Sequence, residues 1–333
     1  MKKFLNEPKR FVDEMIEGIL KAHPDDLMCI NGNSRVLVRC NKKEGKVAIV
    51  TGGGSGHLPL FLGYVGEGLL DGCAVGNVFA SPSASVIFEV TKAVDSGVGI
   101  FYLFGNYSGD RMNFDMAAEM AEMEGIHVEQ LRVADDIASA PIENKSKRRG
   151  IAGIFFTYKI AGAAAERMYS LEEVVRITKK AHENIRSIGV ATSSCILPEV
   201  GKPNFILNEN EMEIGMGIHG EPGIMKMNIK TADEVTSILL EKVFEELQLI
   251  NDDKVAVLIN GLGATPKEEM YIIYRSIHTI LENKNIKIHR SYIGEFATSM
   301  EMAGFSITLF KLDSELEELL DMPAYSPFFE QQK

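Results

Sequence analysis

Residues 47–57 read VAIVTGGGSGH, an apolar run that ends in a glycine-rich turn and a histidine. A short apolar run bounded by glycines is typical of a buried strand in a parallel sheet. In open α/β sheets, ligands bind outside the carboxyl ends of the strands, and glycines there let the backbone approach a ligand closely. The stretch therefore predicts an α/β fold with a ligand site around Gly54, Ser55, Gly56 and His57.

The same order of strand, glycines and histidine occurs a second time in the chain. Residues 211–218 are expected to form a strand, and residues 215–223 read GMGIHGEPG. Four glycines and a proline surround His219, so few side chains crowd its imidazole. A second candidate ligand site is therefore expected at His219.

Strand-like and helix-like patterns alternate along the whole chain. We expect two α/β domains, residues 1–187 and 188–333, each with a mixed β-sheet flanked by helices and with a binding cleft between them. Further strands are predicted at 99–104, 128–133, 254–259, 286–293 and 305–312, and helices at 11–20, 110–124, 161–168, 171–185 and 231–247.

Two helix starts carry capping signals. Thr231 and Glu234 have the spacing of a capping box. Thr265 is expected to cap a second helix, in which Pro266 takes the first position and Glu268 completes a box.

Composition excludes several classes of function. The formal net charge of −12 makes a nucleic-acid backbone or an anionic membrane surface an unexpected partner. The N-terminus becomes charged before an apolar core of signal-peptide length develops, and no apolar run is long enough to cross a membrane. We therefore expect a cytoplasmic protein. The cysteines are scattered without metal-ligand spacing and are expected to be buried apolar residues: Cys29, Cys40, Cys73 and Cys195.

Asp110 lies in a third candidate loop. The predicted strand 99–104 ends near the start of a helix, and Asp110 stands in the connection. Because this strand and strand 47–50 end at the same edge of a sheet, Asp110 is expected to approach His57. A carboxylate beside an imidazole forms an acid–base pair that can move a hydroxyl proton. The alternative is that Asp110 only caps the helix that follows.

The glycine turn does not favour a nucleotide as the ligand. The Lys-Ser/Thr ending of a nucleotide-binding loop is absent, and His57-Leu58-Pro59 stands in its place. A neutral polyol or carbonyl compound fits better. At His219, a neutral imidazole nitrogen can add to a ketone and form a hemiaminal. The alternative is a metal ligand, for which Glu213 and Glu221 are the nearby carboxylates, but no metal is expected.

Taken together, these motifs resemble the dihydroxyacetone kinase family, specifically its sugar-binding subunit. The resemblance covers nearly the whole chain and rests on many motifs in the same order. They are GGGSGH (52–57), FASPS (79–83), NYSGD (106–110), RRGIAG (148–153), KIAGAAAE (159–166), SC (194–195), GIHGEPG (217–223) and NGLGATP (260–266).

The resemblance implies a homodimer in which His219 holds dihydroxyacetone as a hemiaminal. It also implies that Gly54 binds the substrate, and that His57 and Asp110 act in proton transfer from the hydroxyl that is phosphorylated. The phosphate would come from ADP or ATP with Mg²⁺ on a separate kinase subunit, and this chain itself would bind no cofactor. In this resemblance, Glu221 and Pro222 are candidates for contacts with the partner subunit.

Two positions depart from the family pattern. Leu58 stands where the family has Glu, and Gly105 stands where it has a Lys that bonds the sugar. In one interpretation, Gly105 opens the pocket for a longer ketose such as erythrulose, and the chain is a working kinase subunit. In another, the chain is a regulatory paralogue that binds dihydroxyacetone and signals to a transcription regulator. We favour the kinase subunit because a sensor needs only His219. A third class, a metal-dependent hydrolase using His57 and His219, is not favoured.

Overall fold

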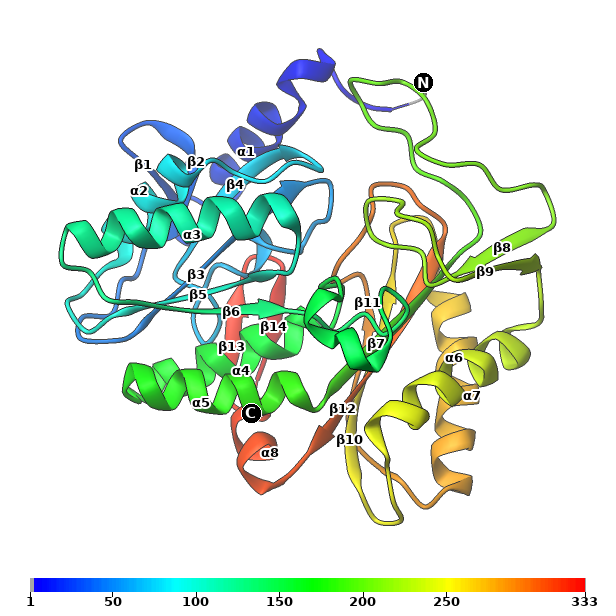
Figure 1. The fold of residues 1–333 in the computed structure, drawn as a ribbon. Coiled ribbons are helices and arrows are strands. Elements are labelled where there is room, and N and C mark those ends of the chain that lie inside the picture. The colour runs from blue at the N-terminus through cyan, green and yellow to red at the C-terminus, as the bar shows by residue number, and fades with distance from the viewer. Residues whose placement is uncertain (1–2, 333) are drawn as a thin grey trace.

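The computed structural model describes residues 3–332 and contains two six-stranded mixed sheets (Figure 1). The first sheet has the order β1-β2-β4-β3-β5-β6, in which β3, β4, β5 and β6 are parallel and β1 and β2 complete one edge in antiparallel pairing. Its strands are β1 (Leu27–Ile30), β2 (Asn33–Arg39), β3 (Ala48–Ser55), β4 (Gly72–Val78), β5 (Ile100–Gly105) and β6 (Val128–Val133). The carboxyl ends of β3 and β5 lie at one edge, as the sequence predicts.

Helices cover both faces of the first sheet. On one face, α2 (Ala84–Val94) and α3 (Ser108–Met123) pack against the side chains of β3 and β5. On the other face lie α4 (Ile154–Glu166) and α5 (Leu171–Glu183). The remaining N-terminal elements are η1 (Pro8–Arg10), α1 (Phe11–Ala22), η2 (Leu62–Tyr64) and η3 (Ile142–Lys147).

The second sheet has the order β11-β10-β12-β7-β8-β9, and within it only the pair β10–β11 is parallel. One face packs against α6 (Ala232–Leu247) and α7 (Lys267–Asn283). Its strands are β7 (Ile185–Ala191), β8 (Glu211–Ile214), β9 (Met225–Asn228), β10 (Lys254–Gly261), β11 (Lys287–Gly294) and β12 (Gly304–Leu312). The chain ends with α8 (Ser314–Leu320) and a two-stranded sheet of β13 (Ala324–Ser326) and β14 (Phe329–Gln331).

Helix α4 lies between the two sheets. Every residue from Ile154 to Ala165 is buried, and the ring of Phe156 lies 5.1 Å from the ring of Phe310 on β12. The C-terminal α8 also packs on α4, so one hydrophobic cluster runs through both sheets. A helix that is apolar all round has no polar face to mark it, which explains why the sequence predicted only 161–168 for this element.

The predicted fold class is confirmed, since both sheets are mixed and both carry helices. The division into 1–187 and 188–333 stays a prediction, and residues 1, 2 and 333 of these ranges lie outside the described part. The first sheet ends at Val133 and the second begins with β7 at Ile185. None of the helices within residues 3–332 combines the length and the apolar character needed to cross a membrane.

Several predicted helices and strands are confirmed and others need correction. The Thr231–Glu234 capping box is present at α6. The box at α7 is not, because Pro266 occupies the N-cap position and the Thr265 hydroxyl is hydrogen-bonded to the backbone of Gly304 instead. Strand β8 ends at Ile214, and so the predicted strand over 211–218 is too long. Strands β1, β2, β4, β7 and β9 and helix α2 were not predicted.

Candidate functional site

The structure brings the two histidine loops together. His57 follows the carboxyl end of β3, and His219 lies in the loop between β8 and β9. Their ring centroids are 4.7 Å apart, with the rings at 84° to each other. Two motifs separated by more than 150 residues of sequence therefore lie side by side, as the sequence predicts.

The segment 298–300, which follows β11, joins these loops. The backbone N–H of Thr298 donates to the carbonyl of His57 over 3.1 Å. The Ser299 hydroxyl donates to the carbonyl of Ile218. The glycine turn and the His219 loop are thus held by the same stretch of backbone.

His57 is buried as a neutral imidazole with one defined tautomer. Its Nδ1 lies 2.8 Å from the carbonyl oxygen of Thr298. Since a carbonyl oxygen only accepts, Nδ1 carries the proton and Nε2 is left as an acceptor. Burial, reinforced by the nearby His219, lowers the pKa of His57 to about 3. The Nε2 atom is buried and has no hydrogen-bond partner among the described residues, so it is available to accept a hydrogen bond from a ligand hydroxyl.

His219 is oriented by a carboxylate two residues further on. One oxygen of Glu221 lies 2.9 Å from His219 Nδ1, and the other accepts from the His219 backbone N–H over 3.0 Å. Burial would raise the pKa of Glu221, but the hydrogen bond and charge of His219, together with Arg149, lower it to about 2. Because the carboxylate accepts, Nδ1–H donates and the lone pair of Nε2 is left free.

Arg149 and Gly217 hold Glu221 in this position. Arg149 lies 3.9 Å from Glu221 and is itself bonded to Asp136 and to the carbonyl of Gly215. A Cβ atom at Gly217 would collide with the Glu221 carboxylate, so the glycine at 217 leaves the space that this carboxylate fills. Besides the expected contact with a partner subunit, Glu221 thus has a second role inside the site, where it orients His219.

Asp110 lies in the first turn of α3 and is buried. Burial raises the pKa of its carboxyl to about 6, against the opposing effects of the Ser81 hydroxyl and of His219. Its Oδ1 atom is buried without a partner in the described residues. Asp110 is not the helix cap, since Tyr107 occupies the N-cap position. Its unpaired oxygen and that of a ligand hydroxyl can share a proton.

Two aromatic rings, of Phe79 and Tyr107, enclose the imidazole of His219. Phe79 stacks on His57 at 4.7 Å and meets His219 edge-on at 5.1 Å. Tyr107 meets His219 at 4.7 Å and 89°, and its hydroxyl donates to the carbonyl of Gly150. Both residues lie in motifs that point to the family, but neither role could be predicted from the sequence, because ring packing depends on contacts between distant loops.

The ring of Tyr107 also bears on the departure at Gly105. A Cβ atom at position 105 would lie 3.1 Å from this ring. The space beside Gly105 is therefore bordered by an aromatic side chain, and the missing lysine does not by itself leave an open extension of the site.

The glycine turn is shaped by two close contacts. A Cβ at Gly54 would lie 2.7 Å from the backbone N of Ala80, and Gly56 has a φ of +106°, a region that favours glycine. The Ser55 hydroxyl donates to the carbonyl of Gly76 and is therefore held against β4. The cavity that this turn lines has only about 10 Å³, which is too small for a ketose.

The remaining histidines and carboxylates do not gather into a metal site. Within residues 3–332, no cluster of three or more His, Cys, Asp or Glu side chains is placed to hold a metal ion. Glu213 accepts from the backbone N–H of Gly223 over 2.7 Å and so supports the loop instead.

The chain is similar to several known proteins. A model of the Dak1 domain matches residues 17–328. The chain is 46% identical over 330 residues to the dihydroxyacetone-binding subunit of PTS-dependent dihydroxyacetone kinase 2 from Listeria innocua, and 99% of each chain is covered. It is 43% identical over 328 residues to the L-erythrulose kinase of Pectobacterium atrosepticum, which covers 97% of this chain and 55% of that protein.

Two solved structures share the fold. The dihydroxyacetone kinase of C. freundii in complex with AMP-PNP and Mg²⁺ aligns with a TM-score of 0.91 and 34% identity, and the match covers 99% of this chain but only 61% of that one. The dihydroxyacetone kinase operon co-activator Dha-DhaQ aligns with a TM-score of 0.90 and 30% identity, covering 98% of this chain and 100% of that one.

Proposed function

We propose, since this chain belongs to the Dak1 domain family, that it is the ketose-binding subunit of a dihydroxyacetone kinase-type phosphotransferase. His219 would hold dihydroxyacetone, or a short ketose such as erythrulose, as a hemiaminal, and a hydroxyl of this ligand would be phosphorylated by a separate kinase subunit. One observation carries the proposal. His219 lies 4.7 Å from His57, measured between ring centroids, and close enough to Asp110 to lower its pKa, while His57 Nε2 and Asp110 Oδ1 are buried acceptors without partners among the described residues.

The hemiaminal forms by addition of the His219 Nε2 atom to the ketone. Nε2 supplies the electron pair for the new bond to the carbonyl carbon, and the C=O π bond breaks. The carbonyl oxygen takes up a proton from solvent, and the Nδ1 proton stays on the ring, donated to the Glu221 carboxylate 2.9 Å away. This carboxylate, whose pKa is lowered to about 2, offsets the positive charge that the addition places on the imidazole.

Proton transfer from the ketose hydroxyl is assigned to Asp110 and His57. Each has a buried acceptor atom without a partner among the described residues, so each can take a proton from a hydroxyl or orient it. Asp110 is the base in this proposal because its pKa of about 6 lies close to neutrality, whereas that of His57 is about 3. His57 then orients the ketose by accepting a hydrogen bond from a second hydroxyl group.

The phosphoryl donor is expected on a partner subunit, as ADP or ATP with Mg²⁺. The glycine turn after β3 ends in His57 and lacks the lysine of a nucleotide loop. The C. freundii kinase that was solved with AMP-PNP and Mg²⁺ extends well beyond the part that matches this chain. The homodimer expected from the family resemblance belongs to the same proposal.

A regulatory paralogue is the second candidate function. It is favoured by the close structural likeness to the co-activator and by the departures at Leu58 and Gly105. In this case the chain would bind dihydroxyacetone through His219 and signal to a transcription regulator. The presence of Asp110 and His57, which a pure sensor does not need, favours the kinase subunit.

Reconstitution of phosphoryl transfer separates these two functions. The protein is mixed with a purified nucleotide-binding kinase subunit loaded with ATP and Mg²⁺, and phosphorylation of dihydroxyacetone and of erythrulose is followed by mass spectrometry. We expect turnover only when both subunits are present. Ligand binding without any turnover of either ketose would favour the sensor.

Glu221→Gln tests the positioning role of this carboxylate. The amide keeps the shape but carries no negative charge to offset that of the imidazole, and a hydrogen bond to a charged group is worth about 1.5–3 kcal/mol. We expect covalent capture of dihydroxyacetone to weaken by roughly 10–100-fold, as measured by titration with intact-protein mass spectrometry. Glu211→Gln on β8 is the control, and equal capture by both variants would remove Glu221 from the mechanism.

A further inference from the structure

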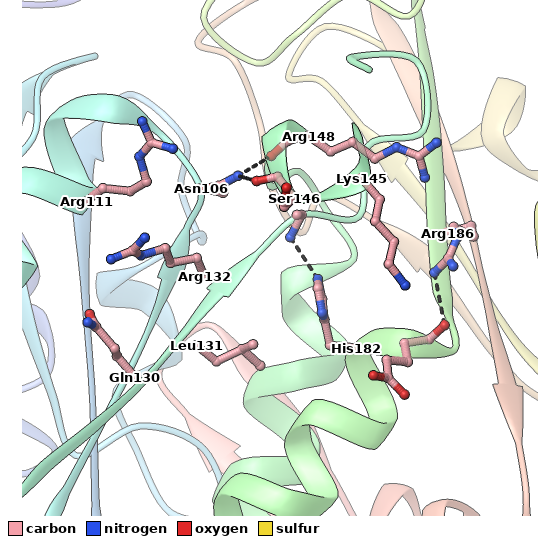
Figure 2. Close-up of a pocket in the computed structure, with 12 residues that line it drawn as sticks. Asn106, Arg111, Gln130, Leu131, Arg132, Lys145, Ser146, Arg148, His182 and Arg186 are labelled. Atoms are coloured by element: carbon pink, nitrogen blue, oxygen red, sulfur yellow. Dashed lines mark hydrogen bonds between the residues drawn. The ribbon is translucent and has the colours of Figure 1, made fainter. Parts of the chain in front are cut away.

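A basic pocket of about 440 Å³ lies on the other side of the loop that carries Asp110. It is bordered by the carboxyl ends of β5 and β6, the first turn of α3, the η3 segment and the last turn of α5 (Figure 2). Its lining side chains include Arg111, Arg132, Lys145, Arg148, His182 and Arg186. Such a concentration of cations is unexpected on a chain with a net charge of −12.

The cations of this pocket exceed the carboxylates that neutralise them. Arg148 and Arg186 share a single carboxylate, that of Glu246. Arg111 and Lys145 are exposed, and no acidic side chain of the described residues forms an ion pair with either. The acidic residue that lines the pocket is Glu183, so an excess of positive charge remains.

One further ion pair lies at the pocket. Arg132 is paired with Asp115 at 2.7 Å, but both side chains are about two-fifths exposed. An exposed pair of this kind is worth little and can exchange for a stronger anion. The guanidinium of Arg132 is thus available to a ligand as well.

His182 adds a neutral donor at the pocket wall. Its Nε2 accepts from the backbone N–H of Ala134 over 2.8 Å, so the ring proton lies on Nδ1. Burial, together with Arg186 and Lys145, lowers the pKa of His182 to about 4. The imidazole is therefore uncharged near neutral pH, in part because of the positive charges around the pocket.

We propose that this pocket binds the phosphate group of a small phosphorylated compound. Arg111 and Arg132, from α3 and β6, line one side of the pocket, and Lys145, from η3, lies on the other side (Figure 2). A tetrahedral dianion can accept from several donors in different directions. The forked N–H donors of a guanidinium group bind phosphate oxygens in pairs.

The phosphate pocket shares its walls with the ketose site. Asn106 lines the pocket and donates to the carbonyls of Ser146 and Arg148, while the next residue, Tyr107, packs on His219. Likewise Arg148 lines the pocket, and its neighbour Arg149 lies against Glu221. A phosphate bound in the pocket would therefore fix the two backbone segments that carry Tyr107 and Arg149, and these residues position His219 and its partner Glu221.

Calorimetric titration of the full-length protein with inorganic phosphate at low salt tests this site. The proposal does not depend on the ketose function, so the probe needs no partner subunit. We expect saturable binding that weakens as salt is added, and that weakens roughly tenfold or more in the double variant Arg111→Gln/Lys145→Gln. Lys147→Gln is the matched control, because Lys147 is exposed in the same η3 segment but does not line the pocket.

Two further titrations identify the source of the phosphate. Dihydroxyacetone phosphate and ADP are titrated under the same conditions as inorganic phosphate. The ligand that binds most tightly of the three identifies the class of compound that the pocket binds. The His182 ring, followed by NMR, should titrate at a higher pH when phosphate is bound, because an anion offsets the field of Lys145 and Arg186.

The proposal is overturned if none of the three ligands binds, or if the double variant and Lys147→Gln bind them equally. An unchanged His182 titration under saturating ligand would place any observed binding elsewhere and would equally reject this pocket. Folding of the double variant is checked by its thermal unfolding, and Arg132→Gln serves as an independent third substitution.

Discussion

His219→Ala will not form a covalent adduct with dihydroxyacetone. The substitution removes the only nitrogen that the proposal assigns to the hemiaminal, and with it the positioning of the ketose. Ketose phosphorylation should therefore fall on the order of 10³-fold or more. Intact-protein mass spectrometry gives the adduct, and ¹³C NMR of ketose labelled at its carbonyl carbon reports conversion of the carbonyl to a tetrahedral centre.

His278→Ala is the control for this prediction. His278 lies on the exposed side of α7 and is more than half exposed, so its loss should leave the adduct and the rate unchanged. A His219→Ala protein that still forms the adduct would place the tether on another residue and would require a different account of the site.

Asp110→Asn should bind the ketose and fail to turn it over. The amide is nearly isosteric but cannot accept the hydroxyl proton, and general-base catalysis typically contributes about 10²–10⁴-fold. Adduct formation through His219 should persist, and kcat should therefore fall with little change in ligand affinity. Glu119→Gln, an exposed carboxylate on the same helix, is the matched control.

The pH dependence of the wild-type protein gives a second readout for Asp110. Its pKa is raised to about 6, so the carboxyl is protonated below this pH and phosphorylation should decline as the pH falls through 6. Burial of the ionised form also opposes folding. The cost of the raised pKa is absent below the unfolded value of 3.8, grows between that value and about 6, and is fully present above 6. Asp110→Asn should therefore unfold at a higher temperature than wild type at pH 7.5.

Wild-type activity that stays level from pH 7.5 to 5, or a kcat of Asp110→Asn equal to that of the control, would remove the carboxylate from proton transfer. The two measurements are independent, since one follows titration and the other follows substitution.

The sequence predicted the parts of the fold that depend on local patterns. The run 47–50 and the glycines after it identified β3 and its turn, since a strand buried on both faces is continuously apolar. The Thr231 capping box identified the start of α6 for the same kind of reason, because cap and helix are adjacent in sequence.

Elements that depend on distant contacts were missed or misplaced. The buried helix α4 shows no amphipathic period, and Thr265 is bonded to Gly304 on β12 and not to its own helix. In the site, His57, Asp110 and His219 could be selected from loop chemistry. The role of Glu221 as the partner of His219 Nδ1 could not, because it requires the loop to fold back on itself.

The proton on His57 is assigned by an oxygen that lies 241 residues away along the chain. Any movement that draws the 298–300 segment back would release Nδ1, and the imidazole could then exchange one tautomer for the other. The acceptor that faces the ketose would become a donor. Substitutions around Thr298, far from the glycine turn in sequence, can thus switch the hydrogen-bonding polarity of the reaction centre without altering a single residue that touches the sugar.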